Sequence, residues 1–325
     1  MERDYRPSFV AVGLAALAAL QPVGDGVASR IRRDKPDERR HKSRHKSRHK
    51  SRHKSRHKSR HKKGVALVRS LRDVIEAEGV AFGAWSIMPA PFATELLARS
   101  GYDWMCVDMQ HGQVGSVESL MPLLQVINAH DVPAFVRIPW KTNFTVAMHA
   151  VDYGAQGVIV PMVDTAEEAA DIVRALRYPP EGERSWAPVR ARLLLDNYSP
   201  EKANKHVFCF VMIETRSGLD HVDEILSVPG VDGAYVGPND LSVSHGGPPL
   251  PTSKNPLLSE LAQRVLDACK RSGRVAGFHA DGPEEALYWS GRGFQVVNVC
   301  SDAGLIAAGS AANVAEVAAG RRQRA

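Results

Sequence analysis

From Val65 onward, short apolar runs alternate with amphipathic segments, a pattern typical of βα units and a parallel sheet. The runs predict eight strands, at residues 81–85, 104–107, 134–136, 157–160, 207–213, 233–236, 274–278 and 295–299. The segments that follow them predict eight helices, at residues 91–100, 117–130, 144–153, 166–176, 218–227, 256–271, 283–290 and 302–319. Eight such units favour an α/β TIM (β/α)8 barrel over residues 64–325. An open doubly wound sheet is disfavoured because no glycine-rich phosphate fingerprint follows the first strand.

Residues 1–63 have a different composition. The apolar run at 9–20 is too short to span a bilayer as a helix, and the acidic Glu2 and Asp4 before it are atypical of a secretory signal. From Arg40, the tetrapeptide Arg-His-Lys-Ser repeats five times. A segment this charged cannot bury enough surface to offset chain entropy, so we predict a disordered basic extension over 1–63. It is interpreted either as a repeat expansion before a self-sufficient domain or as a polyanion-binding tail.

The net charge of the whole chain is positive, but residues 64–325, called the acidic body, carry a net negative charge. The formal net charge is +6, yet residues 64–325 carry 22 basic and 30 acidic side chains, a net of −8. An acidic body argues against a nucleic-acid-binding face on the barrel. The four cysteines are far apart, form no Cys-x-x-Cys pair and mostly lie in or beside apolar runs. They indicate reduced, buried thiols and a cytoplasmic enzyme.

Two predicted strands each deliver one carboxylate at the carboxyl end. The run 207–213 ends in Glu214, and the run 233–236 is followed by Gly-Pro-Asn-Asp, which ends in Asp240. In a parallel barrel all strand ends meet at one edge, so these two acids come together and repel each other unless a cation or a shared proton compensates. A hard divalent ion, Mg²⁺ or Mn²⁺, is the simplest occupant. The alternative is that Glu214 caps a helix and Asp240 closes a turn.

Other polar side chains complete a ring at the same edge. They are Trp85 near the end of strand one, Asp108 at the end of strand two with His111 just beyond it, Arg137 after strand three and His279 after strand seven. A guanidinium suits a substrate carboxylate or an enolate oxygen, and an imidazole suits proton transfer near neutral pH. A divalent ion would hold a 2-oxo acid and stabilise its enolate as a Lewis acid. Alternatively, Arg137 pairs structurally with an acid and His111 is an ordinary loop histidine.

Lysine is missing from the predicted strand ends. An aldolase that works through a Schiff base needs a desolvated lysine at the site, and Lys141, in what looks like an exposed loop, is the only nearby candidate. The pattern therefore favours metal-assisted over imine chemistry. The one long irregular connection, 177–206, is expected to act as a lid near the substrate aldehyde, because long connections in compact domains are often functional.

Several stretches resemble a known family, the HpcH/HpaI aldolase/citrate lyase family. They are FGAWSIMPAPFATELLARSGYDWMCVDMQHG, AFVRIPW, GAQGVIVPMVDTAEEA, RYPPEGERS, VMIET and GVDGAYVGPNDLS, and together they span about residues 66–320 in order. Within the family they are similar to the class II pyruvate aldolases that act on 4-hydroxy-2-oxo acids. The resemblance implies a phosphoenolpyruvate/pyruvate-type barrel, a last helix exchanged between subunits, a homo-oligomer (hexameric in most assemblies) and a Mg²⁺, Mn²⁺ or Co²⁺ cofactor.

The resemblance also implies roles for individual residues. Glu214 and Asp240 match the metal ligands, Arg137 matches the residue that binds pyruvate, and His111 matches the acid/base. Asp152 matches the aspartate that pairs with this histidine, and Asp108 matches another acid of the same cluster. The backbone amides of Asn239 and Asp240 would hold the pyruvate carboxylate, with Trp85 and His279 on the substrate side.

The chain departs from the family pattern in two places. Met212 stands where some relatives have a glutamine two residues before the metal-binding glutamate, and Gln110 stands where some have a glutamate before the histidine. By comparison with the family, the first departure is expected to affect the ordering of water around the metal ligands, and the second to lower the negative charge near the base.

The predicted activity is cleavage of a 4-hydroxy-2-oxo acid to pyruvate and an aldehyde by a divalent-metal-dependent aldolase. One alternative is an acyl-CoA lyase of the citramalyl or malyl type on the same barrel, although the acidic body offers no basic cluster for the CoA phosphates. The other alternative is a polyanion-binding protein that acts through the basic tail.

Overall fold

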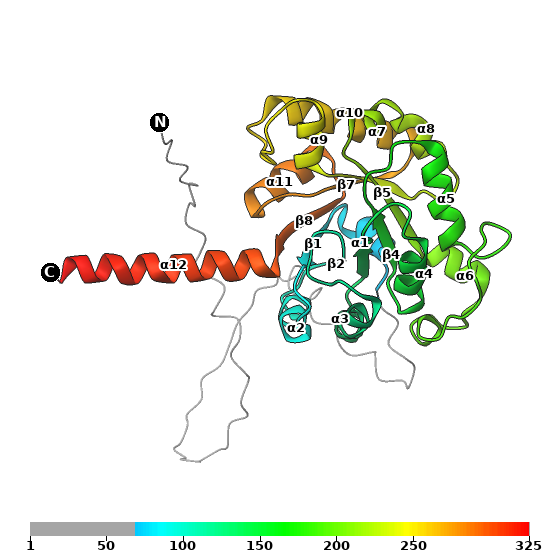
Figure 1. The fold of residues 1–325 in the computed structure, drawn as a ribbon, viewed down its shortest axis with the longest axis horizontal. Coiled ribbons are helices and arrows are strands. Elements are labelled where there is room, and N and C mark those ends of the chain that lie inside the picture. Colours follow the sequence, from blue (N-terminus) through cyan, green and yellow to red (C-terminus); the bar gives the residue numbers. More distant parts are fainter. Residues whose placement is uncertain (1–68, 325) are drawn as a thin grey trace, which may run out of the picture. The chain divides into compact units, whose positions relative to one another are not determined.

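The computed structural model describes residues 69–324, and the predictions for residues 1–63, including the domain boundary, lie outside this range. Eight parallel strands form a closed barrel in sequence order, with β8 paired to β1 (Figure 1). The strands are β1 (Ala81–Ser86), β2 (Trp104–Asp108), β3 (Ala134–Arg137), β4 (Gly157–Val160), β5 (Phe208–Ile213), β6 (Gly233–Val236), β7 (Val275–Phe278) and β8 (Val296–Ser301). The prediction of a TIM barrel is confirmed.

Helices surround this barrel, and local sequence signals mark where they begin. They are α1 (Leu71–Glu78), α2 (Pro91–Arg99), α3 (Val117–Ala129), α4 (Phe144–Asp152), α5 (Ala166–Leu176), α6 (Pro200–His206), α7 (Arg216–Asp220), α8 (Val222–Ser227), α9 (Pro238–Ser244), α10 (Pro256–Ser272), α11 (Pro283–Arg292) and α12 (Asp302–Gln323). Ser116, Thr165 and Thr215 each cap a helix by accepting a hydrogen bond from the amide three residues on. Proline opens α2, α6, α9, α10 and α11, where its missing N–H costs nothing.

Some boundaries differ from the prediction. The helix predicted at 218–227 is two short helices, α7 and α8, which meet at His221, where the backbone leaves helical geometry (φ −104°, ψ 17°). The sequence pattern did not predict α1, α6 or α9. Helix α1 is too short and too polar to stand out, yet its Leu71 and Val74 are buried in the barrel interior.

The barrel interior is filled by large aromatic side chains that lie against glycines of neighbouring strands. A Cβ on any of four strand glycines would come within 2.3–2.6 Å of an aromatic ring atom. The pairs are Gly83 with Trp104, Gly157 with Phe135, Gly233 with Phe210 and Gly277 with Tyr235. These positions have room only for hydrogen, which lets the rings pack to native density.

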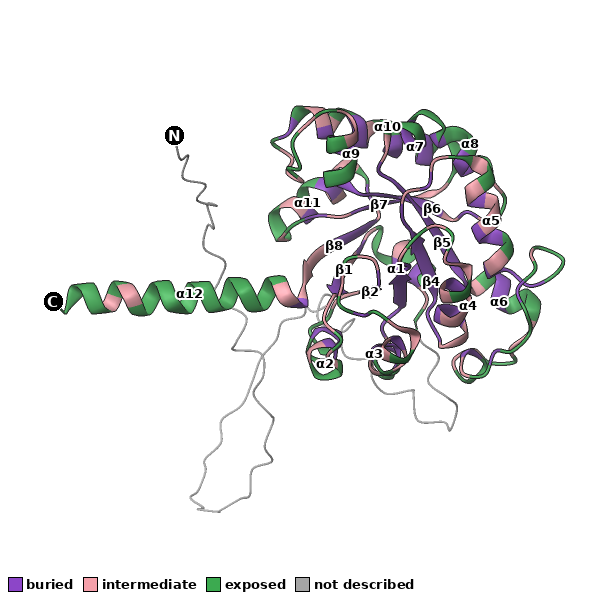
Figure 2. Cartoon of the chain, in the orientation of Figure 1, coloured by how far each residue is buried: buried purple, intermediate pink, exposed green. Residues whose placement is uncertain are grey.

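Helix α12 is an exception to the compact packing. Beyond its first turn it extends away from the barrel and is exposed along nearly its whole length, whereas the strands are buried (Figure 2). Within residues 69–324 it is the single helix whose length and apolar composition would allow it to cross a membrane. Its start is anchored by Asp302, whose carboxylate accepts hydrogen bonds from the Ser86 hydroxyl and from the amides of Ile87 and Met88.

We expect Gly277→Ala to lower the free energy of unfolding by about 2 kcal/mol, because the added methyl would overlap the Tyr235 ring, 2.3 Å away. Gly291→Ala on α11 is the matched control. A Cβ there would meet no atom within 4 Å, so this change should leave stability unchanged or raise it slightly. Urea denaturation of both variants tests the difference, and equal midpoints would contradict the packing described here.

Candidate active site

The carboxyl ends of the strands bring most of the predicted site residues to one end of the barrel. Trp85 lies in β1, and Asp108 and Arg137 are the last residues of β2 and β3. Glu214 follows β5, and His279 follows β7. Asp240 is carried by α9, directly after β6. The closed parallel ring is what gathers these side chains from distant parts of the chain.

Arg137 and Asp108 form a buried two-pronged ion pair across the β2–β3 contact. Arg137 Nε donates to Asp108 Oδ1 (2.8 Å) and Nη2 donates to Oδ2 (2.6 Å). Burial favours the neutral carboxyl, but the hydrogen bonds and charge of Arg137 outweigh it and lower the pKa of Asp108. The guanidinium carbon lies 4.5 Å from the centre of the Trp85 ring, so the side chain is held from two sides. The structural pairing considered as an alternative for Arg137 is thus present.

Glu214 is the most perturbed acid of the site. It is 2% exposed, and its Oε1 accepts a hydrogen bond from the Met162 amide (2.7 Å). Burial raises its pKa to about 7; the Met162 amide opposes this shift, and the charge of Asp240 adds to it. Thr215, not Glu214, caps the following helix. The alternative role of Glu214 as a helix cap is therefore wrong.

Helix α9 presents its first amides at the same end of the barrel. Its N-cap is Gly237, which has no side chain to satisfy these amides. A Cβ at Gly237 would lie 2.1 Å from Glu214 Oε2, so only glycine lets the backbone pass this close to the carboxylate. Asn239 and Asp240 are both exposed at this helix start.

Two histidines lie near the ion pair in different environments. His279 packs edge-on against Trp85, with ring centres 4.6 Å apart, and its Nδ1 is buried without a hydrogen-bond partner in the described part of the chain. Burial and then the charge of Arg137 lower its pKa to about 3, so it is neutral. His111 is exposed in the loop after β2. The backbone amide of His111 donates to Asp108 Oδ1 (3.4 Å).

Asp152 is the one predicted catalytic residue that the structure does not bring to this end of the barrel. It is the last residue of α4, which runs from the carboxyl end of β3 back to the start of β4. Its carboxylate accepts a hydrogen bond from Arg184 Nη2, and within residues 69–324 it makes no contact with His111. Within the described part of one chain Asp152 is thus paired with Arg184 and not with His111, and the pairing of His111 with Asp152 stays a prediction. The resemblance matched Asp152 by its position in the sequence, but it did not indicate at which end of the barrel α4 would place this residue.

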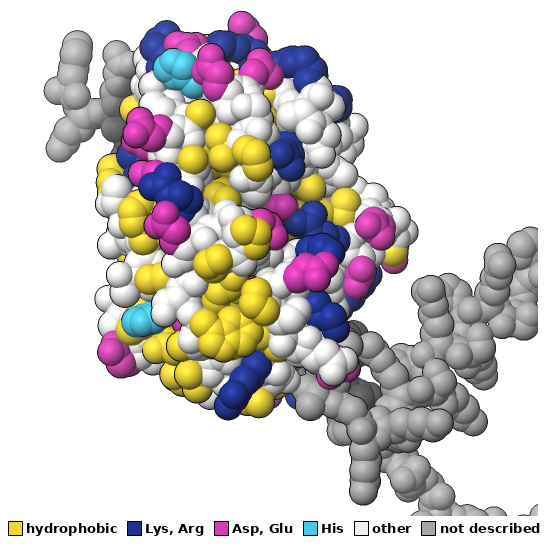
Figure 3. All heavy atoms as spheres, turned by 90° about the vertical axis from the view of Figure 1, so that its right-hand side faces the viewer, with side chains coloured by type: hydrophobic (Ala, Val, Ile, Leu, Met, Phe, Trp, Pro, Cys, Tyr) yellow, Lys and Arg dark blue, Asp and Glu magenta, His cyan; other side chains and the backbone are white. Residues whose placement is uncertain are grey.

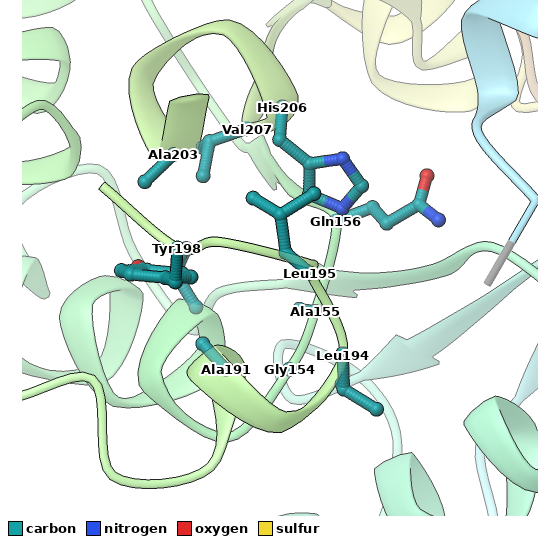
Figure 4. Close-up of a pocket in the computed structure, with 11 residues that line it drawn as sticks. Gly154, Ala155, Gln156, Ala191, Leu194, Leu195, Tyr198, Ala203, His206 and Val207 are labelled. Carbon is teal, nitrogen blue, oxygen red and sulfur yellow. The ribbon is translucent and has the colours of Figure 1, made fainter. Parts of the chain in front are cut away.

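The long connection between α5 and β5 also lies elsewhere than predicted. It joins the end of a helix to the start of a strand, so it covers the amino end of the barrel, away from the strand-end acids. It contains α6 and exposes Trp186, Val189 and Leu193, and the face that includes α5 and α6 shows a group of hydrophobic side chains (Figure 3). A small cavity lies beneath it, lined mainly by apolar side chains such as Leu195 and Tyr198 (Figure 4). The expectation that this connection is a lid at the site is wrong.

Lys141 is not the free loop lysine that the sequence suggested. Its side chain is 14% exposed, and its Nζ lies 2.8 Å from Asp164 Oδ2 and 2.6 Å from Glu168 Oε1. Burial would lower its pKa, but these two carboxylates outweigh burial and raise it. Paired with two carboxylates, Lys141 differs from the desolvated lysine that a Schiff-base aldolase needs.

The acids of the site suit a divalent cation, although residues 69–324 contain no group of three or more His, Cys, Asp or Glu side chains in ligand geometry. Two carboxylates fit an ion such as Mg²⁺ or Mn²⁺, which takes one or two carboxylates and leaves its other positions to substrate and water. Burial and the neighbouring Asp240 disfavour the ionised form of Glu214, and a bound cation would favour that form. The donor set therefore fits the predicted ion.

The fold and the strand-end side chains define a (β/α)8 barrel that carries carboxylates, a guanidinium and an imidazole at the carboxyl edge of the sheet, where the active sites of such barrels lie. The profile of the HpcH/HpaI aldolase/citrate lyase family matches residues 82–308. The chain belongs to this family, and it is an aldolase-type enzyme, as the resemblance predicted.

Individual relatives agree with this assignment. A hydroxypyruvate/pyruvate aldolase from Roseovarius nubinhibens is 34% identical over 220 residues, which covers 66% of this chain and 83% of the relative. A 2-keto-3-deoxy-L-rhamnonate aldolase from Escherichia coli K12 is 34% identical over 227 residues, which covers 68% and 83%. The crystal structure of a family member from Burkholderia cenocepacia superposes with a TM-score of 0.66 at 30% identity, over 73% of this chain and 94% of the other.

The raised pKa of Glu214 predicts a pH-dependent penalty in metal-free protein. An acid whose folded pKa (about 7) exceeds its unfolded value (4.5) costs nothing below pH 4.5, and its cost grows up to pH 7 and stays constant above it. Glu214→Gln should therefore stabilise chelator-treated protein more at pH 8 than at pH 5, by about 2 kcal/mol. Urea midpoints at both pH values measure this difference. An equal effect at pH 5 and pH 8 would contradict the raised pKa.

Proposed function

We propose that the protein is a divalent-metal-dependent aldolase that reversibly cleaves a 4-hydroxy-2-oxo acid to pyruvate and an aldehyde. The observation that carries this proposal is the buried Glu214 beside Asp240, facing an arginine that an acid holds in place. The names of the two aldolase relatives, one acting on hydroxypyruvate and pyruvate and one on a 2-keto-3-deoxy sugar acid, support a 2-oxo acid substrate. The acidic barrel and these relatives support a cytoplasmic location.

Glu214 and Asp240 would hold the ion, with Mg²⁺, Mn²⁺ and Co²⁺ as the candidates. When bound, the ion supplies Lewis-acid charge to the carboxylate and keto oxygens of the substrate. The uncapped amides at the start of α9, those of Asn239 and Asp240, are available to bind the substrate carboxylate. Trp85 and His279 form an apolar and neutral wall beside Arg137.

Arg137 stabilises negative charge on the substrate. Its Nε and Nη2 are occupied by Asp108, while its Nη1 makes no hydrogen bond within the described residues and is available to the keto oxygen. Asp108 fixes the orientation of the fork before substrate arrives, so little reorganisation is needed as the enolate forms. Replacement of Asp108 would loosen this orientation even though the acid itself does not touch the substrate.

His111 is placed to move the proton of the 4-hydroxyl group. It takes this proton, the C3–C4 bond breaks, the aldehyde leaves, and the electron pair of the bond becomes the pyruvate enolate facing Arg137. Return of the proton to C3 gives pyruvate and restores the imidazole. The Asp108 carboxylate accepts a hydrogen bond from the backbone amide of His111. Asp108 therefore contacts both Arg137 and the loop that carries His111.

We also propose that the enzyme is a homo-oligomer in which α12 packs on a second copy, with a hexamer as the expected assembly. The helix exposes Leu305, Ile306, Val314 and Val317 to solvent. The barrel exposes Phe92 and Leu96 on α2 and Leu287 on α11. Such apolar groups on a monomer indicate a protein interface. Asn313 and Glu316 within α12 disfavour a bilayer as its surroundings.

The enzymatic proposal predicts that pyruvate release from 4-hydroxy-2-oxoheptanedioate or 2-dehydro-3-deoxyglucarate is abolished by EDTA and restored by Mg²⁺, Mn²⁺ or Co²⁺. Glu214→Gln should lower kcat/KM by about 100-fold or more at fixed metal concentration, because one of two charged ligands is lost. Glu201→Gln, at an exposed surface pair with Lys205, is the control and should match the wild type. Full activity of Glu214→Gln would show that the assignment is wrong.

The proposal of a homo-oligomer predicts that a chain ending at Gly304 is monomeric in light scattering after gel filtration, whereas the wild type is oligomeric. This truncation keeps Asp302 and its anchoring bonds, so the barrel should stay folded. A chain ending at Gly320 keeps the apolar residues of α12 and should assemble like the wild type. An unchanged mass for the shorter chain would refute the role of α12.

A further inference from the structure

Three consecutive loops at the carboxyl end of the barrel are tied together beside Glu214. The link is Asp164, in the loop after β4. Its Oδ1 accepts the hydroxyl hydrogen of Thr215, which follows β5, and its Oδ2 accepts a hydrogen bond from Lys141 Nζ (2.8 Å), in the loop after β3. The side chains of Lys141 and Asp164 are 14% and 27% exposed, so these bonds are largely shielded from water.

Glu168, in the first turn of α5, completes this network. Its Oε1 lies 2.6 Å from Lys141 Nζ, and its Oε2 accepts the backbone amide of Asp164 (2.8 Å). Asp164 is therefore bonded through both its side chain and its backbone. We name the four residues Lys141, Asp164, Glu168 and Thr215 the loop clamp. Thr215 is also anchored to its own helix, because its hydroxyl oxygen accepts the Gly218 amide (2.8 Å).

One residue close in sequence to Asp164 of the loop clamp has a backbone conformation that is rarely adopted. Met162, two residues before Asp164, has φ +58°, in the left-handed region that non-glycine residues rarely occupy. This conformation aims its amide at Glu214 Oε1 (2.7 Å). A residue in such a conformation persists only when its surroundings hold it there, and such residues cluster at functional sites.

We propose that Asp164 is a positioning residue for Glu214, holding the Met162 amide and the Thr215 hydroxyl so that the carboxylate is oriented for a divalent cation. The inference rests on the proposed metal-binding role of Glu214. It follows from connectivity: Met162 donates its amide to Glu214, Thr215 follows Glu214 in the sequence, and Asp164, two residues after Met162, bonds to the Thr215 hydroxyl. With Oε1 fixed by Met162 and Oε2 against the Gly237 backbone, the carboxylate keeps one orientation only while both loops stay in place.

The test measures the affinity of full-length protein for Mn²⁺ by isothermal titration calorimetry. Asp164→Ala removes both side-chain bonds and should raise the Kd about tenfold or more. Thr215→Val, which keeps the side-chain shape and removes only the hydroxyl, should also weaken binding and remains usable if Asp164→Ala fails to fold. Asp164→Asn retains an acceptor for the Thr215 hydroxyl and should fall between Asp164→Ala and the wild type. Asp171→Ala, which breaks an exposed pair with Arg174 on α5, should bind like the wild type.

A second measurement follows the Met162 amide itself in metal-free protein. Its hydrogen exchange, by mass spectrometry of the peptide that contains it, should become about fivefold faster in Asp164→Ala and stay unchanged in Asp171→Ala. Wild-type Kd or unchanged exchange in Asp164→Ala, with Glu214→Gln clearly weakened, would overturn this inference alone. Undiminished Mn²⁺ binding by Glu214→Gln would instead overturn the proposed metal site and, with it, the role of Asp164.

Discussion

Closure of eight parallel strands into one ring is the constraint on which this molecule depends. The helix after each strand returns the chain to the same end, so all strands run in one direction, and closure brings residues as far apart in sequence as Asp108 and His279 to the same edge. It also creates an interior that side chains must fill, and the chain fills it with aromatic rings laid over strand glycines such as Gly277. Trp85 packs against these interior side chains, and the guanidinium of Arg137 lies over the Trp85 ring.

Charge compensation divides the site into two parts. Asp108 and Arg137 neutralise each other through two hydrogen bonds, and the pair is complete without any ligand. Glu214 is buried, and burial raises its pKa to about 7; the charge of Asp240 adds to this shift, while the Met162 amide and the charge of Arg137 oppose it. The oriented guanidinium of Arg137 thus lies near a buried acid whose ionised form is disfavoured, an arrangement that suits a cation and an anionic substrate bound together. Hydrogen bonds of the loop clamp around Asp164 join the three loops next to this site.

Much of the fold could be predicted because its signals are local. Strand β6 and helix α5 begin and end at the predicted residues, since apolar runs, helix caps such as Thr165 and glycine or proline breaks all lie within a few residues. Helix α1 was missed because its polar sequence becomes a core element only when Leu71 and Val74 meet the barrel interior. The strand-end positions of Glu214 and Arg137 followed from the same local pattern. The contacts of Asp152 and Lys141 could not be predicted from local patterns, because each residue pairs with a partner distant in the sequence. The partner is Arg184 for Asp152 and Asp164 for Lys141.

By itself, the sequence determined the βα alternation, the family and the residue types at the strand ends, because each is written in short, contiguous motifs. Only the tertiary structure decided which acids are compensated, since a pairing such as Arg137 with Asp108 depends on the register of neighbouring strands. It also placed the long connection before β5 at the far end of the barrel, because the direction of the chain, not its composition, decides which edge a loop covers. The left-handed Met162 carries no sequence signal at all. In that conformation its amide donates a hydrogen bond to Glu214, a partner 52 residues away in the sequence.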